Sequence, residues 1–447
     1  MRVPSRPPLR LPTTRRTFLG GAALAAVTLG GARGQPLPDR KTIAEGFRVI
    51  RASTGMAPLR GPGHGPTLIW GYNGAIPGPT IRTGRGEEIR VRLVNDLDEP
   101  TTVHWHGVRL ANPMDGVAQL TQPPIAPGAS FDYRFVAPDA GTFWYHAQVN
   151  AQRQQAHGLY GALIVDEAEP VDVDRDVTLV FADWWLGTTG TIVDPGSTEP
   201  ADGDRGQRYL TVNGLPSLDI PVKSNERLRL RVINAATTRV LSFRLDRHQV
   251  IVMAIDGEPA EPFEAEDSRF TLGPGNRIDV FLDTTLAPGS GAALTVNDAG
   301  RETAIVRLAY EAGPAGRPEP RTALTALPAN PLPERMDLEH ALKLDLEIGT
   351  SSAGAALFTV KRGRAVMLGF VNRSPASFAM HVHGHHFRLL DRLDDGWRPY
   401  WLDTLVVPAG QTMRIAFVAD NAGKWLLQGT ALDARAAPMA QWFEGTA

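Results

Sequence analysis

The clearest pattern in this chain is a short run of alternating apolar and polar residues that occurs three times and ends at an asparagine. Side chains in a strand alternate between its two faces, so each run predicts a half-buried β-strand. The three runs are residues 87–95 (EEIRVRLVN), 226–234 (ERLRLRVIN) and 364–372 (RAVMLGFVN). A second strand is expected after a turn, and nine residues beyond each asparagine it contains His104, Phe243 and His381.

Turn signals follow the same repeat. Each copy is followed by a proline and a glycine, at 127–128, 274–275 and 408–410, before another alternating strand, and the repeat period is about 140 residues. Short alternating strands separated by such turns are typical of all-β sandwiches. We therefore predict three tandem Greek-key β-sandwich domains over residues 40–167, 168–312 and 345–447, with a proline-rich linker over residues 313–344.

The first 34 residues have the features of an export signal. They contain six arginines and no acidic residue, and residues 19–31 form an apolar run rich in small residues. This run is too short to span a bilayer. A basic start followed by a short apolar core is typical of a secretory leader. Residues 14–19 (TRRTFL) resemble a twin-arginine signal, which predicts export of the folded protein to a bacterial periplasm. The alternative is a generic basic tail.

The charge of the remaining chain excludes some partners. Removing the six leader arginines from 46 basic residues leaves 40 against 48 acidic ones, a net charge of −8. An acidic chain without a basic stripe is not expected to bind nucleic acid. No later segment is long and apolar enough to predict a membrane span.

Histidines occupy equivalent positions in the first and third copies of the repeat. Both copies carry His-X-His-Gly, as His104/His106 and His381/His383, and another histidine, His146, ends the strand 141–146. Residues i and i+2 of a strand face the same side, so each pair presents two imidazoles together. The chain has no cysteine, and imidazole clusters without thiolates suit copper, zinc, iron or nickel. The alternative is that these histidines are structural.

These motifs together resemble those of the bacterial multicopper oxidases, which are laccase-like proteins. The resemblance covers nearly the whole chain after the leader, and it implies three cupredoxin-like domains with a copper cluster between the first and the third. It rests on the segments HWHG at 104–107, GTFWYH at 141–146, HVHGHHF at 381–387, MDGVAQLTQPPIAPG at 114–128, GLYGALIVD at 158–166 and LTVNGLP at 210–216.

The resemblance implies a role for each matching residue. His104 and His381 match the two ligands of the type 2 copper. His106 and His146 match ligands of one type 3 copper, and His383 matches a ligand of the other. Asp115 matches an acidic residue that helps proton delivery near the cluster; the alternative is that its Asp-Gly pair only forms a turn. His385 matches a position that usually supports the ligands, and His386 is expected to point away from them.

The chain departs from the family at the remaining ligand positions. The type 1 copper needs a cysteine and two histidines, and this chain has Gly429, Phe378 and Ala434 there. Only Met439 matches the usual axial ligand. Three expected type 3 histidines are Gln148, Gln428 and Thr430. We therefore predict a reduced, type 2-like site with one metal ion, copper first and zinc as the alternative.

Three functions are compatible with this residue set. The first is a periplasmic copper oxidoreductase that acts directly on a small-molecule or metal-ion substrate and is not a working laccase. The second is a copper-binding or copper-tolerance protein without turnover. The third is a copper-free scaffold with a protein partner, similar to the relative associated with bacterial cell division. Fold alone does not decide among them.

Overall fold

The computed structural model describes residues 43–44, 46–197, 206–298, 300–349, 354–390, 400–433 and 436–447. The predicted leader and Ala434 lie outside these ranges. The described chain is almost entirely β-structure, as predicted, and its helices are α1 (Ala151–Ala156), η2 (Asn112–Met114) and η3 (Glu266–Ser268). None of the helices in the described ranges has the length and apolar character needed to cross a membrane.

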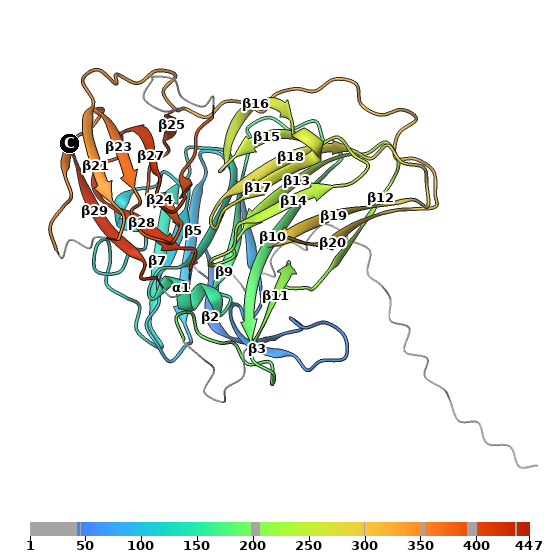
Figure 1. Cartoon of the computed structure of the whole chain (residues 1–447), viewed down its shortest axis with the longest axis horizontal. Coiled ribbons are helices and arrows are strands. Elements are labelled where there is room, and N and C mark those ends of the chain that lie inside the picture. Colours follow the sequence, from blue (N-terminus) through green and yellow to red (C-terminus); the bar gives the residue numbers. More distant parts are fainter. Residues whose placement is uncertain are drawn as a thin grey trace, which may run out of the picture. The chain divides into compact units, whose positions relative to one another are not determined.

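The described strands form six sheets, two in each third of the chain. The sequence colours of Figure 1 distinguish the three thirds as blue to cyan, green to yellow and orange to red. In the first third, one sheet contains β1 (Ile43–Ala44), β2 (Phe47–Ala57), β3 (Thr67–Tyr72), β5 (Glu88–Asn95) and β7 (Ser130–Val136). The other sheet has the order β4 (Gly78–Gly84), β9 (Tyr160–Asp166), β8 (Gly141–Ala147) and β6 (Val103–His106).

The second third repeats this arrangement of two sheets, and its sheets contain more strands. One sheet has the order β11 (Gln207–Val212), β10 (Arg175–Leu186), β13 (Arg227–Asn234), β18 (Arg277–Asp283), β15 (Ile251–Ile255) and β16 (Glu258–Glu264). The other has the order β12 (Leu218–Val222), β20 (Arg301–Tyr310), β19 (Gly291–Asp298), β14 (Leu241–Leu245) and β17 (Arg269–Leu272).

The last third also has two sheets. The first has the order β21 (Leu342–Glu347), β23 (Ala365–Val371), β27 (Thr412–Val418) and β25 (Arg388–Leu390). The second has the order β22 (Thr359–Lys361), β29 (Met439–Thr446), β28 (Gly423–Ala431), β24 (Phe378–Val382) and β26 (Thr404–Val407). In each third a cluster of buried apolar side chains joins the two sheets, for example Val91 of β5 with Leu163 of β9 in the first. Apolar burial between two sheets is the main stabilising force of such a sandwich.

The repeated asparagine explains why the three copies share one local structure. Asn95, Asn234 and Asn372 are buried, and the side-chain Nδ2 of each donates to at least two backbone carbonyls. The Oδ1 of each accepts a hydrogen bond from the backbone N–H two residues later. Each asparagine therefore ends its strand in a fixed turn, which places the next strand at a constant offset.

Two of these next strands carry the histidine pairs. Across β6 and β8, His104 lies opposite His146. Across β24 and β28, His381 lies opposite Gln428. The two pairs are structural equivalents, since β6 and β24 follow the same asparagine turn.

Candidate metal centre

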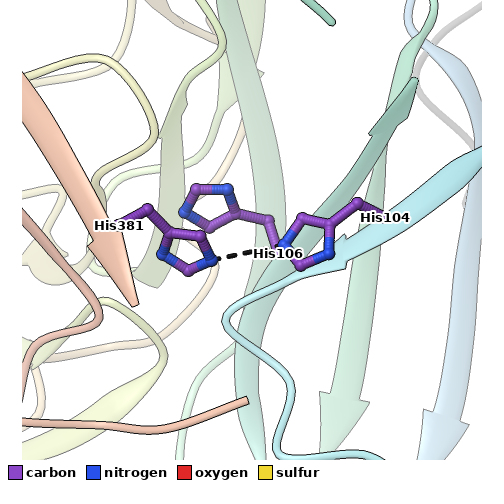
Figure 2. A group of neighbouring side chains, drawn as sticks. All are labelled: His104, His106 and His381. Carbon is purple, nitrogen blue, oxygen red and sulfur yellow. Dashed lines mark hydrogen bonds between the residues drawn. The ribbon is translucent and has the colours of Figure 1, made fainter. Parts of the chain in front are cut away.

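Histidines from the first and third parts of the chain meet at one buried site. Figure 2 shows His104 and His106 on β6 extending toward His381 on β24. Ring nitrogens of these three side chains all lie within 4.8 Å of one another, and the three side chains are buried. The structure therefore brings together two motifs that are separated by 277 positions.

The outer nitrogens of His104 and His381 are held by acceptors. Nδ1 of His104 lies 3.0 Å from the carbonyl oxygen of Asp115, and Nδ1 of His381 lies 2.9 Å from the carbonyl oxygen of Asp403. A carbonyl oxygen can only accept, so both Nδ1 atoms carry the hydrogen. The inner Nε2 atoms then present lone pairs, and they face each other at 3.2 Å. Two acceptors in this position can share a metal ion, because metal–nitrogen bonds of about 2.0–2.1 Å reach both.

His106 and His146 form a second pair of the same kind. Nδ1 of His146 donates to the carbonyl oxygen of Ala147 at 2.9 Å. The hydroxyl of Thr404 donates to the Asp403 carboxylate at 2.8 Å and accepts from Nε2 of His106, also at 2.8 Å. The remaining nitrogens, Nδ1 of His106 and Nε2 of His146, therefore face each other as acceptors at 3.3 Å.

His383 is oriented by the predicted acidic residue. Its Nδ1 lies 3.0 Å from the Asp115 carboxylate, which also lies 3.1 Å from Nδ1 of His104. Asp115 thus supports two predicted ligands at once, as carboxylates beside metal-binding histidines commonly do. Nε2 of His383 lies 3.4 Å from Gln428 Oε1, and the same oxygen accepts from Gln148 Nε2 at 2.6 Å. Two glutamine side chains therefore lie hydrogen-bonded to each other beside His383, at positions where the resemblance implies histidines.

Burial sets the protonation states of the cluster. Desolvation lowers the pKa of all five predicted ligand histidines: His104, His106, His146, His381 and His383. Burial acts to raise the pKa of Asp115, but the contacts with His383 and His104 outweigh it and lower that pKa. The site thus combines neutral imidazoles, the form that binds metals, with an ionised supporting carboxylate.

A steric constraint explains why the first His-X-His-Gly motif ends in glycine. Gly107 has a φ of +85°, and a Cβ there would lie 2.3 Å from a guanidinium nitrogen of Arg277 and 2.5 Å from the Asp403 carboxylate. Only glycine fits this close approach at a positive φ. The Arg277–Asp403 ion pair, at 2.7 Å, can therefore pack directly behind β6.

A cavity of about 400 Å³ opens beside the histidines. His106, His146 and His381 form part of its wall, with Gln428 and Thr430 beside them. The remaining lining mixes apolar side chains, such as Trp144 and Leu426, with amides and Arg153. A small organic molecule or a hydrated ion fits this volume and would contact the imidazoles directly.

Apolar side chains fill the region where the resemblance implies a type 1 copper. A Cβ at Gly429 would lie 2.9 Å from Sδ of Met380 and 3.2 Å from Cβ of Met439. Phe378, Met380 and Met439 all belong to the buried apolar cluster of the last third.

Some side chains differ from the sequence interpretation or were missed by it. Nδ1 of His385 donates to the His383 carbonyl at 3.0 Å, and its ring packs among Phe417, Trp425 and Phe443, in the apolar core. Asp403 and Thr404 hold His381 and His106, but no motif marked them, because they reach the site only by the pairing of β26 with β24.

Comparison with known proteins agrees with the geometry. Three models described as multicopper oxidase match residues 57–170, 175–307 and 329–441. The chain is similar to the multicopper oxidase MmcO of Mycobacterium tuberculosis, with 31% identity over an alignment of 480 positions that covers 93% of each protein. It is also similar to the crystal structure of Lac15 from a marine microbial metagenome, with 32% identity, a TM-score of 0.77, and 89% of this chain and 99% of that chain covered.

The multi-copper oxidase of Pseudomonas thermotolerans gives the same result, with 31% identity, a TM-score of 0.78, and 89% of this chain and 98% of that chain covered. Both structural matches cover most of this chain, and they confirm the predicted cupredoxin-like fold. The chain belongs to the multicopper oxidase family.

Proposed function

We propose that this protein is an exported copper-binding oxidoreductase in which His104 and His381 hold a single copper ion. The observation that carries the proposal is the pair of Nε2 lone pairs facing each other at 3.2 Å, with both Nδ1 hydrogens held by carbonyl groups. Membership of the multicopper oxidase family implies copper as the ion, and imidazole donors suit it. Zinc is the alternative ion for the same donors.

The residues around this pair have distinct roles in the proposal. Asp115 and the Asp403 carbonyl orient the rings, and Thr404 fixes His106 beside them. A bound copper would supply one-electron redox chemistry and an open coordination position. A substrate in the 400 Å³ cavity would contact the site directly, since His106, His146 and His381 line the cavity wall.

The replaced ligands support the view that the protein is not a working laccase. Electron transfer through a type 1 copper needs a thiolate, and Gly429, packed against Met380 and Met439, cannot supply one. The hydrogen bond between Gln148 and Gln428 supports a low copper count, because it occupies the amide groups where further ligands would be needed. The twin-arginine motif supports export to the periplasm.

Copper content and electron paramagnetic resonance of the protein after copper loading and desalting test the proposal. We expect about one copper per chain with a type 2 signal and no blue absorption. His104→Ala should lose this copper, and His340→Ala, at an exposed histidine, should retain it. Equal copper in both variants would contradict the assignment.

Turnover is tested separately by copper-dependent oxygen consumption with a phenol or a cuprous donor. Consumption that His104→Ala abolishes supports the enzyme. Copper retention without consumption would favour the copper-tolerance function instead. A folded protein that retains no copper would favour the scaffold with a protein partner.

A further inference from the structure

A second group of buried metal-binding side chains lies apart from the histidine cluster. It consists of Asp139 between β7 and β8, Glu258 at the start of β16, and His386 between β24 and β25. Their ligand atoms all lie within 4.8 Å of one another, and the three residues are buried. Each lies in a different one of the three multicopper oxidase matches.

His386 has no hydrogen-bond partner, although its side chain is fully buried. Neither Nδ1 nor Nε2 makes a hydrogen bond, and Nε2 lies 3.6 Å from Glu258 Oε1 and 3.7 Å from Asp403 Oδ2. Glu258 Oε1 also has no partner. Buried polar atoms are nearly always satisfied, so two facing orphan ligand atoms indicate a missing third group between them.

The arginine ion pairs nearby engage Asp139 of this cluster but not Glu258. Arg109 already pairs with Asp139 and Asp420, and Arg277 pairs with Asp403 and Asp256. The hydrogen-bond partner of Glu258 among the described residues is the neutral Asn330 amide, at 2.9 Å. A buried carboxylate without a cation is costly, and a divalent ion would remove that cost.

The backbone is packed so that these side chains must lie close together. A Cβ at Gly141 would lie 2.0 Å from the carbonyl oxygen of Gly257, so these two backbone segments are in direct contact beside Asp139 and Glu258. Asn330, in the predicted linker, fixes the segment next to Asp139, because its amide makes two 2.9 Å hydrogen bonds with the backbone of Ala140. The carboxylates are therefore positioned before any ligand binds.

We propose that Asp139, Glu258 and His386 bind a divalent cation of the zinc class, which joins the three cupredoxin-like parts of the chain. One imidazole and two carboxylates form a nitrogen and oxygen donor set that zinc accepts. The Nε2–Oε1 distance of 3.6 Å is near the ligand–ligand spacing of about 3.3–3.4 Å that tetrahedral bonds of about 2.0–2.1 Å produce. This site is independent of the copper proposal and shares none of its ligands.

Zinc alone is the probe. The parent is the full chain with His104→Ala and His381→Ala, so that the facing His104–His381 pair does not contribute. After zinc loading and desalting, we expect about one zinc per chain and a higher melting temperature than without zinc. His386→Gln and Glu258→Gln should each lose the zinc and the melting shift. His340→Gln and Glu261→Gln are matched controls, since both residues are exposed and Glu261 lies on the same strand as Glu258.

Two results would overturn the proposal: a folded parent that retains no zinc, or zinc that stays at the parent level in both His386→Gln and Glu258→Gln. If His386→Gln fails to fold, Glu258→Gln still decides, because the change keeps the shape of the side chain. Zinc X-ray absorption on the parent adds a second readout. One imidazole among oxygen ligands supports the site, and a shell of several imidazoles contradicts it.

Discussion

Two equivalent strand pairs contribute to the candidate copper site, and they differ in the residue that lies opposite the histidine. Across β6 and β8 the facing residues are His104 and His146, whereas across β24 and β28 they are His381 and Gln428. The backbone register is the same, so the difference lies in side-chain chemistry alone. One pair presents two nitrogen lone pairs to the site, and the other presents one nitrogen and one amide.

The difference between the two sides is local to the hydrogen bonds of these residues. On the β28 side, Gln428 satisfies Gln148 by a hydrogen bond instead of binding metal. On the β6 side, the supports of the histidines are intact, including both contacts to Asp115. The three cupredoxin-like parts remain packed around the site although Gln148, Gln428 and Thr430 occupy positions where the resemblance implies histidines. The fold therefore does not depend on a complete copper cluster.

The largest expected difference is between the two members of one strand pair. His381→Ala should abolish stoichiometric copper binding, because it removes one of the two facing Nε2 atoms. Gln428→Ala, at the opposite position on β28, should leave copper content unchanged. Copper per chain after loading and desalting measures both. Similar copper loss in the two variants would mean that the amide is a ligand and that the comparison is wrong.

Sequence patterns predicted much of this arrangement, since the asparagine repeat and the His-X-His pairs are local signals. The equivalent placement of the two histidine pairs follows from the constant offset of nine residues, which the buried Asn95, Asn234 and Asn372 enforce. The sequence could not indicate Asp403 or Thr404, because they contact the histidines only through strand pairing. It also could not reveal the cluster of Asp139, Glu258 and His386, which three distant segments bring together.

A smaller effect is expected at Asp115, which supports histidines from both strand pairs. Asp115→Asn keeps the backbone carbonyl that holds His104 but weakens the contact with Nδ1 of His383. Loss of such a support typically costs about 10–100-fold in metal affinity. Copper titration against a competing chelator measures this change.

Asp98→Asn, at an exposed aspartate, is the matched control for Asp115→Asn. Unchanged affinity in Asp115→Asn would show that Asp115 only forms its turn. That outcome would leave the backbone carbonyl of Asp115 as its orienting contact with His104.

The smallest expected effect is on stability, at the hydrogen bond between the two glutamines. Gln428→Ala removes the acceptor for Gln148 Nε2 and leaves that amide and His383 Nε2 facing the cavity. Because both glutamines are only partly buried, water can replace part of the loss, and we expect a decrease of about 1 kcal/mol in the free energy of unfolding. Denaturant unfolding without metal measures it, with Gln411→Ala, at an exposed glutamine, as the control. A loss that matches the control would mean that the amide pair does not stabilise the junction, and the replacement of the copper ligands would then have no structural compensation.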